Sequence, residues 1–478
     1  MLQGTGSDVG KSVLVAGLCR IAKRRGIRVA PFKPQNMSNN AAACADGGEI
    51  GRAQALQAMA CGLPPEVDFN PVLLKPESDR RAQVVLRGKA LKTDEAAHYM
   101  ATRGGFLPTV LDSFESLRAR FELVIVEGAG SPAEVNLRKG DIANMGFAVA
   151  ANVPVVLVGD IDKGGVIASI VGTQAVLDEV DNAQIKAFLI NKFRGDPRLF
   201  DDGLSVIETR TGWPSLGVVP WLKSTARLPA EDAVVLEHSV TTGHGTLKIV
   251  APMLSRIANF DDADPLRQHD GVTFEWIKPG QNIPQDADIA VLFGSKSTVA
   301  DLAFLRAQGW HHDLYAHHRQ GKRVLGICGG YQMLGKRIHD PEGFEGEAGS
   351  VDGLGLLDVE TTLQSQKVVT PVLAKSALFG FELSGYEIHI GHTTGADCQR
   401  PMFRIENRLD GAISRDGLVQ GSYVHGLFAD DAFRVKWLGV GSKHHYQQGV
   451  ENALDELADE LEAVIDFDRL LALATSSL

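Results

Sequence analysis

The stretch Gly4-Thr5-Gly6-Ser7-Asp8-Val9-Gly10-Lys11-Ser12 decides the fold of the first half of the chain. It places a glycine-rich turn between a short strand, residues 1–3, and a segment of good helix formers. Backbone amides in such a turn, together with the N-terminus of the helix, can surround phosphate groups. Lys11 would meet the outer phosphates, and Ser12 would bind Mg²⁺. The pattern predicts an ATP site whose loop includes Gly4, Thr5, Gly6 and Gly10.

This loop is longer than the simple Walker pattern, because its first glycine lies one residue further back, and it resembles the loop of the dethiobiotin synthetase family. The strand before it is either short or truncated at its start. Phosphoryl transfer also needs a carboxylate on the metal. Glu127 is the first candidate, since it ends an apolar strand before a glycine turn. Asp46, before paired glycines, either binds the metal or is an ordinary turn residue. Asn191 looks like residues that frame a nucleotide base at the carboxyl end of a sheet.

Around the loop, the first half alternates short β-rich runs with longer helical patterns, which is typical of a parallel sheet with crossover helices. The second half shows strands and helices again after a Pro-rich, acidic interruption. We therefore expect two α/β domains. The predicted strands are residues 28–31, 123–126, 153–158, 187–190, 215–219, 247–251, 289–293, 323–327, 356–359 and 418–423. The predicted organisation is a P-loop synthetase domain at 1–230, a linker at 231–246, a second domain at 247–440 and a helical tail at 441–478, with an amphipathic helix over 451–473 packed on the body.

The second domain carries a cysteine at a sharp turn. Residues 324–335 are typical of a strand, a glycine-flanked turn with Cys328 at its centre, and a helix. Small neighbours allow strained backbone angles, and the helix N-terminus favours a thiolate and offers N–H groups to an oxyanion. A buried structural cysteine would not need three flanking glycines. Cys328 is therefore the predicted nucleophile.

A thiolate nucleophile requires a base that moves protons, and residues 421–428 offer His425 at the end of another strand. The backbone around Gly294 and Ser295, together with Gly329, would supply the oxyanion N–H groups. These three segments together resemble the class I glutamine amidotransferase family. That resemblance implies a flavodoxin-like domain that takes ammonia from L-glutamine.

Most members of that family carry an acid two residues after the histidine, whereas this chain has Leu427 there. The third member of the triad is therefore missing or displaced. Glu387 and His389 are the candidates for a substitute orienter or a substrate contact.

Across nearly its full length the sequence resembles the cobyric acid synthase family of cobalamin biosynthesis. The resemblance implies a glutamine-hydrolysing carbon–nitrogen ligase, which uses ATP to amidate carboxylates b, d, e and g of a corrinoid, adenosylcobyrinic acid a,c-diamide. One alternative is a cobyrinic acid a,c-diamide synthase. Another, from a different class, is a ParA- or MinD-like ATPase with a degenerate binding domain. The resemblance rests on residues 3–12, 33–40, 46–54, 127–144, 191–196, 326–335 and 421–428.

The net charge, the cysteines and the absence of targeting patterns narrow the classes of protein to which the chain can belong. A formal net charge of −11 disfavours binding to nucleic acids and to anionic membranes. The five cysteines are scattered, which fits neither a disulfide framework nor a zinc site. We found neither a signal peptide nor a membrane-spanning pattern, so a cytoplasmic protein is expected. The sequence leaves open whether the protein forms a homo-oligomer.

Overall fold

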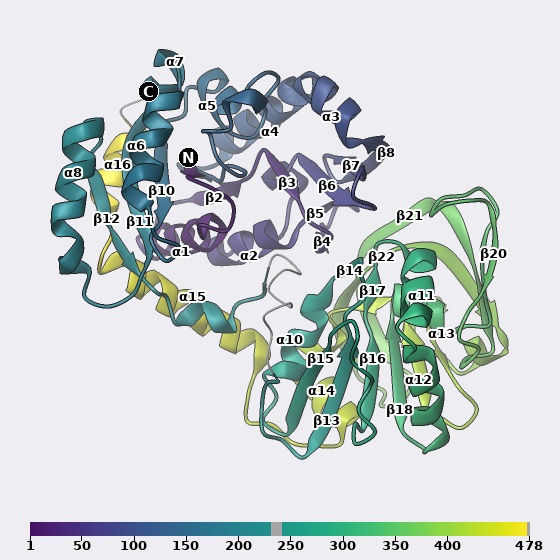
Figure 1. The fold of residues 1–478 in the computed structure, drawn as a ribbon. Helices are drawn as coiled ribbons and strands as arrows, with labels where there is room; N and C mark the ends of the chain where they lie inside the picture. Colours follow the sequence, from purple (N-terminus) through teal and green to yellow (C-terminus); the bar gives the residue numbers. More distant parts are fainter. Residues whose placement is uncertain (231–240, 476–478) are drawn as a thin grey trace.

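Buried parallel strands form the centre of the N-terminal body in the computed structural model, which describes residues 1–230 and 241–475 (Figure 1). One sheet has the order β1–β10–β11–β12, and a parallel pair, β2 and β9, adjoins β1 through a bridge between Leu2 and Glu127. The strands are apolar on both faces, as expected for a sheet covered by helices on both sides. Their bounds are β1 Leu2–Gly4, β2 Val29–Phe32, β9 Leu123–Val126, β10 Val155–Asp160, β11 Ile185–Phe193 and β12 Ser215–Pro220.

Helices cover both faces of this sheet. Helices α1 and α2 lie on one side, whereas α5, α6 and α8 share a separate hydrophobic cluster with β10, β11 and β12. This arrangement brings the carboxyl ends of the strands to one open edge, which is where open α/β sheets bind ligands. The helices of this body are α1 Lys11–Arg24, α2 Arg52–Cys61, α3 Ala96–Thr102, α4 Leu107–Arg120, α5 Met145–Ala150, α6 Val166–Val176, α7 Glu179–Gln184 and α8 Asp201–Thr211.

A small sheet that the sequence did not predict extends from this body toward the C-terminal body. Its order is β3–β6–β7–β8, and a hairpin of β4 and β5 lies beside it. Ala41, Leu73 and Val85 from this extension share a hydrophobic cluster with Ile388 of the C-terminal body. The extension therefore forms much of the contact between the two bodies. Its strands are β3 Gln35–Met37, β4 Ala41–Ala43, β5 Glu49–Gly51, β6 Val72–Pro76, β7 Arg81–Leu86 and β8 Lys89–Glu95.

The C-terminal body is built on a six-stranded sheet of order β15–β13–β16–β18–β26–β25, parallel except for β25. Helices α11 and α13 pack together beside it (Figure 1). The two-domain α/β class expected from the sequence is confirmed. The bounds are β13 Leu247–Pro252, β15 Val272–Ile277, β16 Ile289–Leu292, β18 Arg323–Ile327, β25 Ala412–Ile413, β26 Val419–Ser422, α10 Asp264–Arg267, α11 Thr298–Ala307, α12 Trp310–Arg319, α13 Gly329–Leu334 and α14 Asp431–Leu438.

A second sheet of this body is dominated by two long antiparallel strands, β21 and β22, which arch toward the N-terminal extension (Figure 1). The strand predicted at 356–359 was placed too early, because β21 begins only at Val359. A separate two-stranded ladder joins β14 and β17. The bounds are β14 Ile257–Ala258, β17 Gly294–Ser295, β19 Arg337–Asp340, β20 Gly349–Asp352, β21 Val359–Ser376, β22 Glu382–Gly395, β23 Phe403–Ile405, β24 Arg408–Asp410 and β27 Val424–His425.

After the C-terminal body, the chain returns to the N-terminal body as α15, Tyr446–Glu462, and α16, Phe467–Thr475. The apolar face of α15 packs against α1 with Leu454, Leu457 and Leu461 fully buried. Gly17 allows this close approach, because a Cβ there would lie 2.3 Å from a methyl of Leu461. The expected amphipathic segment is thus helical, although it is divided into two helices.

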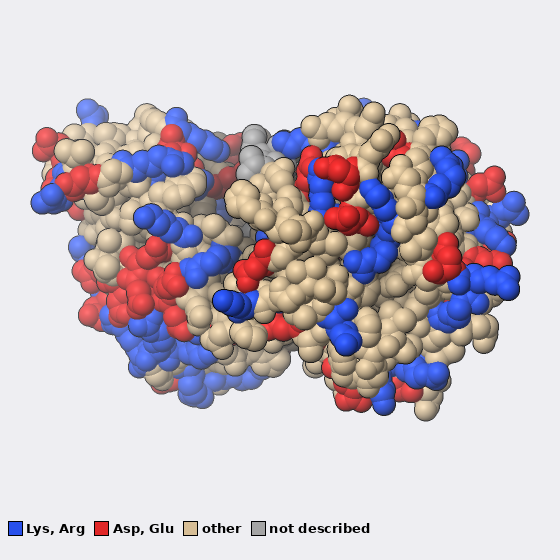
Figure 2. All heavy atoms as spheres, turned by 90° about the horizontal axis from the view of Figure 1, so that it is seen from below, with Lys and Arg blue, Asp and Glu red and all other residues tan. Residues whose placement is uncertain are grey.

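Ion pairs border the contact between α1 and α15. Arg20 pairs with Glu451 at 2.7 Å and with Asp455 at 2.8 Å, and Arg24 pairs with Asp459 at 2.7 Å. Seen from below, acidic and basic side chains lie side by side on both lobes of the molecule, and on the left lobe a group of acidic side chains borders a group of basic ones (Figure 2). Charges on this face are therefore largely balanced locally.

Shortening Leu457 to Ala is expected to lower the free energy of unfolding by about 2–5 kcal/mol, because it leaves a cavity between α15 and α1. Urea denaturation of the full chain measures this change. Leu199→Ala is the matched control, since that leucine is 81% exposed and its truncation should change stability by less than about 0.5 kcal/mol. Equal stabilities of the two variants would contradict the proposed contribution of this contact.

The linker predicted at 231–246 falls partly on residues 231–240, which lie outside the described residues, and the exact domain limits stay predictions. Within residues 1–230 and 241–475, no helix combines the length and apolar character needed to cross a membrane.

Candidate active site

Cys328 lies at the turn between β18 and α13, as the sequence predicted. Its backbone has φ 53° and ψ −112°, a conformation that a non-glycine residue rarely adopts and that places the side chain at the tip of the turn. Gly330 is required here, because a Cβ would lie 1.9 Å from the carbonyl oxygen of Leu292. The Cys328 sulfur lies 3.4 Å from the carbonyl oxygen of Ile388 on β22.

The loop after β16 comes close to this turn. A Cβ built at Gly329 would lie only 2.9 Å from the amide nitrogen of Ser295. A Cβ at Gly294 would lie 3.4 Å from the His425 ring. The three residues predicted to supply oxyanion N–H groups are therefore gathered around Cys328.

His425, at the end of β27, completes a contact chain that reaches Cys328. Its Nδ1 lies 2.7 Å from a carboxylate oxygen of Asp262, and the ring also interacts electrostatically with Cys328. The other oxygen of Asp262 accepts a hydrogen bond of 2.6 Å from the Gly426 amide. Burial alone would lower the pKa of His425, but the charges of Asp262 and Cys328 outweigh burial and raise it to about 10. His425 is therefore held as an imidazolium between an acid and the thiol.

Asp262 occupies the place of the orienting residue for which the sequence offered Glu387 and His389, so the orienter role predicted for them is corrected, whereas a substrate contact stays a prediction. The β22–β27 ladder places Tyr386 opposite His425, and its ring stacks on the imidazole with 5.1 Å between centroids. Glu387 is the next residue along the strand and therefore points to the other face. There it forms an ion pair with Arg408.

His389 lines the same cavity as the thiol. Among the described residues, no hydrogen bond joins His389 to His425. Its ring stacks on Tyr423 with 3.8 Å between centroids. Burial, together with the positive charges of His425 and Arg408, lowers the pKa of His389 to about 3. His389 is thus a neutral residue in the wall of the site.

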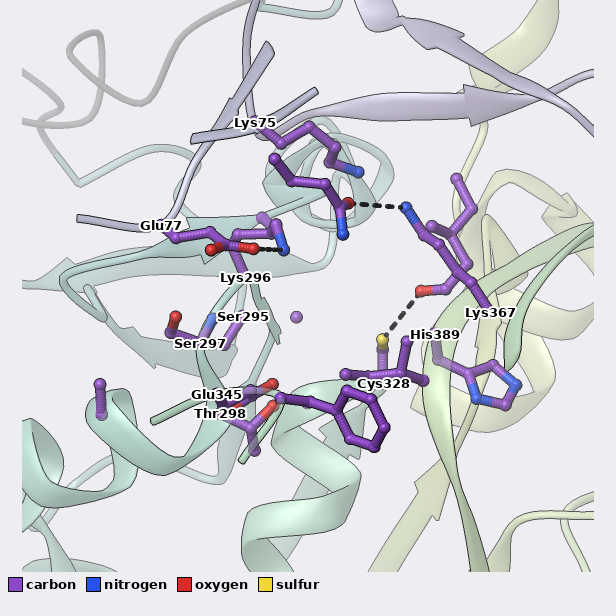
Figure 3. Close-up of a pocket in the computed structure, with 18 of the residues that line it drawn as sticks. Lys75, Glu77, Ser295, Lys296, Ser297, Thr298, Cys328, Glu345, Lys367 and His389 are labelled. Carbon is purple, nitrogen blue, oxygen red and sulfur yellow. Dashed lines mark hydrogen bonds and ion pairs between the residues drawn. The ribbon is translucent and has the colours of Figure 1, made fainter. Parts of the chain in front are cut away.

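The thiol opens into a cavity of about 410 Å³ that both bodies line (Figure 3). Cys328 directs its sulfur into this space, which has the size of a small-molecule site. Lys296 of the C-terminal body pairs with Glu77 of the N-terminal body across the cavity at 2.9 Å. Other lining residues are Lys75, Arg81, Gln83, Ser295, Thr298, Glu345 and Lys367.

A buried charge cluster joins the two bodies at the same cavity. Glu49 of β5 pairs with Lys75 of β6 at 2.9 Å and also with Lys367 of β21. Burial lowers the pKa of Lys367 to about 7, against the opposing effect of Glu49. Buried charges require such partners, so the cluster fixes how the two bodies meet at this point.

The phosphate loop of the N-terminal body surrounds a second site. Lys11 donates to the carbonyl oxygens of Gly6, at 3.0 Å, and Gly130, at 3.2 Å. Gly10 has φ 91°, and a Cβ there would lie 2.4 Å from the Asn191 amide nitrogen. Asn191 donates to the carbonyl oxygen of Val9 at 2.7 Å. The structure therefore brings the predicted Asn191 against the loop.

Glu127 lies at the centre of this second site. It accepts hydrogen bonds from Ser12 at 2.7 Å and from Gln57 at 2.6 Å, and it pairs with Lys33 at 2.7 Å. The hydroxyl of Ser12 and the carboxylate of Glu127 are hard oxygen donors, which suit Mg²⁺ beside nucleotide phosphates. The donor set thus fits the expected metal.

Asp46 has a different environment. It lies at the exposed turn between β4 and β5, where its carboxylate accepts from the Gly48 amide at 3.2 Å. This place favours the turn interpretation of Asp46 over metal binding.

Sequence reasoning missed Asp262, Lys33 and Gln57 as named site residues. Lys33 opens the segment 33–40, which is one of the segments that carry the family resemblance. Asp262 lies in the run Asn259-Phe260-Asp261-Asp262-Ala263-Asp264, where three acids occur among apolar neighbours. Acids among apolar neighbours become buried when the chain folds, and buried carboxylates need hydrogen-bonding or charged partners. Such a run therefore indicates that partners for these acids lie elsewhere in the chain.

Comparison with known proteins identifies the family of each body. A family model for a CobQ/CobB/MinD/ParA nucleotide binding domain matches residues 1–235, and one for a CobB/CobQ-like glutamine amidotransferase domain matches residues 248–433. The cobyric acid synthase of Hyphomonas neptunium is 64% identical, with 100% of this chain and 97% of that protein covered. The cobyric acid synthase of Paracoccus denitrificans is 61% identical, with 99% of each chain covered.

Proposed function

The chain belongs to the cobyric acid synthase family, and from this we propose that it amidates carboxylates b, d, e and g of adenosylcobyrinic acid a,c-diamide with ATP and L-glutamine. The observation that carries the proposal is the pairing of a Cys328–His425–Asp262 chain with a phosphate loop in one polypeptide. A ligase of this kind needs both an ammonia source and a means to activate a carboxylate.

The C-terminal body would release ammonia from glutamine. The Cys328 sulfur attacks the side-chain amide carbon, while amides near Gly329 and Ser295 stabilise the oxyanion. His425 gives its proton to the departing nitrogen, so ammonia leaves and a thioester remains. Water, deprotonated by His425, then cleaves the thioester to glutamate and restores the thiol. Asp262 holds the imidazole in the orientation that both steps require.

The N-terminal body would activate the acceptor carboxylate. A carboxylate oxygen of the corrinoid attacks the terminal phosphate of ATP, which gives an acyl phosphate and ADP. Ammonia then attacks the acyl carbon, and inorganic phosphate leaves. Lys11 would hold the outer phosphates, and Asn191 the base side of the nucleotide. Mg²⁺, held by Ser12 and Glu127, would neutralise phosphate charge when bound.

Product mass provides the direct test of this function. Purified enzyme with adenosylcobyrinic acid a,c-diamide, glutamine and ATP should give the product in which four hydroxyl groups are replaced by amino groups. Amidation of cobyrinic acid instead would favour the a,c-diamide synthase alternative. Turnover of ATP without any amide product would favour a MinD-like ATPase, which leaves the Cys328 site unexplained.

The expected location is the cytoplasm. All five cysteines are free in the structure, and a reducing compartment would preserve the thiol that the proposed mechanism requires.

Asp262→Asn is expected to lower glutaminase kcat/KM by about 10²- to 10⁴-fold, because it removes the acid that orients His425. It should also move the alkaline limit of activity. The charge of Asp262 helps to raise the pKa of His425 to about 10, so the imidazolium persists up to that pH in the wild type. Without this charge the imidazolium is lost at lower pH, and a pH profile of glutamate release will show the shift.

Asp264→Asn is the matched control for this variant. Asp264 is a neighbouring buried acid, but it pairs with Arg267 and not with His425. An unchanged pH profile in Asp262→Asn, or the same change in both variants, would contradict the role of Asp262.

A further inference from the structure

Helix α2 of the N-terminal body begins at the edge of the other body's active site. Its first residue, Arg52, is mostly buried and forms an ion pair with Asp261. The same guanidinium donates to the Tyr386 hydroxyl at 2.6 Å, and it lies 5.3 Å from the centroid of that ring. One side chain from the synthetase half thus contacts two residues of the glutaminase half.

Asp261 and Tyr386, the two residues that Arg52 contacts, both lie next to the groups that hold His425. Asp261 immediately precedes Asp262, whose carboxylate holds the imidazole Nδ1. Tyr386 lies opposite His425 in the β22–β27 ladder, and the two rings are stacked with an interplanar angle of 16°. The imidazole is therefore held through its nitrogen by Asp262, the neighbour of Asp261, and against one face by Tyr386, while Arg52 fixes Asp261 and Tyr386.

Charge explains why a cation is needed at this point. Asp261 and Asp262 are adjacent buried carboxylates, and burial raises the pKa of Asp261 while Arg52 opposes that change. A buried carboxylate without a partner is costly, so loss of Arg52 would favour movement of this short segment. This segment carries Asp262, the acid that orients His425, so any movement of the segment would displace the imidazole.

The Tyr386 hydroxyl is held from both bodies. Asn259 donates to this hydroxyl at 2.9 Å, and the same amide donates to the carbonyl oxygen of Ala41 in the N-terminal hairpin, also at 2.9 Å. The contacts of Arg52 with Tyr386 and of Asn259 with Ala41 therefore form only when the bodies are docked. An isolated glutaminase half would lack these restraints.

We propose that Arg52, a residue of the synthetase half, is a positioning residue for the glutaminase reaction, which it serves by fixing Asp261 and Tyr386 around His425. The inference rests on the proposed glutaminase role of Cys328. Helix α2 also carries Gln57, which donates to Glu127 at the phosphate loop. A single ten-residue helix therefore contacts both active sites.

The test compares Arg52→Gln, Arg52→Lys and Tyr386→Phe in the full-length enzyme. Arg52→Gln should lower glutaminase kcat on the order of 100-fold, the effect of a small misplacement of a reacting group, while KM for glutamine changes little. Amidation with added ammonium salt should stay near the wild-type rate. Arg52→Lys should recover part of the activity because it restores the charge, and Tyr386→Phe should show a smaller loss.

Two further measurements separate positioning from simple instability. Alkylation of Cys328 by iodoacetamide needs no corrinoid, and it should slow several-fold in Arg52→Gln. Asp79→Asn is the matched control, because it removes another ion pair between the bodies, Arg256 to Asp79 at 2.9 Å, without approaching His425. This control should keep wild-type glutaminase activity and alkylation.

Wild-type glutaminase activity in Arg52→Gln would overturn the proposal. So would an equal loss of ammonia-dependent amidation in that variant, or an equal loss of glutaminase activity in Asp79→Asn, since either result would indicate a general effect on docking. Failure of the wild-type enzyme to release glutamate would instead refute the glutaminase function itself.

Discussion

Replacement of Cys328 by Ala is expected to abolish glutamine-dependent amidation and to leave ammonia-dependent amidation largely intact. The thiol is the attacking atom in the proposed glutaminase reaction, and removal of a nucleophile lowers turnover by more than about 10⁴-fold. The synthetase half does not use the thiol, because Lys11, Ser12 and Glu127 form a separate group around the phosphate loop. Parallel assays with glutamine and with ammonium salt, each read as amide product, measure both activities.

Cys398→Ala is the control for that experiment. Cys398 is a partly exposed thiol of the same body whose sulfur lies 3.9 Å from the Tyr331 hydroxyl, and it takes no part in the proposed reaction. Glutamate release by Cys328→Ala at the wild-type rate would refute the nucleophile. Loss of the ammonia-dependent reaction in Cys328→Ala would show that the two halves do not act separably.

Lys11→Ala is expected to remove both the glutamine-dependent and the ammonia-dependent activity, each on the order of 10³-fold. Lys11 begins α1 and is held at the loop by the carbonyl oxygens of Gly6 and Gly130. Its charge would stabilise the phosphates during transfer, and no ammonia source can replace an activated carboxylate. Release of ADP together with amide product, measured with ammonium salt, follows the step directly.

Lys23→Ala on the same helix provides the comparison, because Lys23 lies in the last turn of α1, away from the loop. This variant should keep both activities. Retention of ammonia-driven turnover in Lys11→Ala would contradict the assignment of the phosphate loop.

The sequence was sufficient for the fold class and for the segments with a strong local signature. Strands such as β9 and β18 have the predicted bounds, because continuous apolar runs that end in glycine turns fix both their type and their limits. The turns that carry Lys11 and Cys328 were identified for the same reason. Each needs glycine at specific positions, and that requirement is visible in the sequence.

The small sheet β3–β6–β7–β8 could not be predicted in this way. Strand β3 is Gln-Asn-Met and β8 is Lys-Ala-Leu-Lys-Thr-Asp-Glu, and neither shows an apolar alternation. Such strands are stabilised by pairing and by contact with the other body, which a local pattern does not report.

Asp262 was missed for a related reason. It lies 163 residues before His425, so no pattern near the histidine in the sequence points to it. Only the register of β22 and β27 shows that Glu387 points away from His425. Long-range pairing of this kind is set by tertiary packing and not by spacing along the chain.

The return of α15 and α16 to α1 means that one body is inserted within the other. The segments before and after the C-terminal body share one hydrophobic core. A chain cut after residue 440 would therefore lose part of the synthetase core, and not only a peripheral appendage. Excision of the nitrogen-supplying module by protein engineering would require two cuts, with residues 1–230 rejoined to the helices that start at Tyr446.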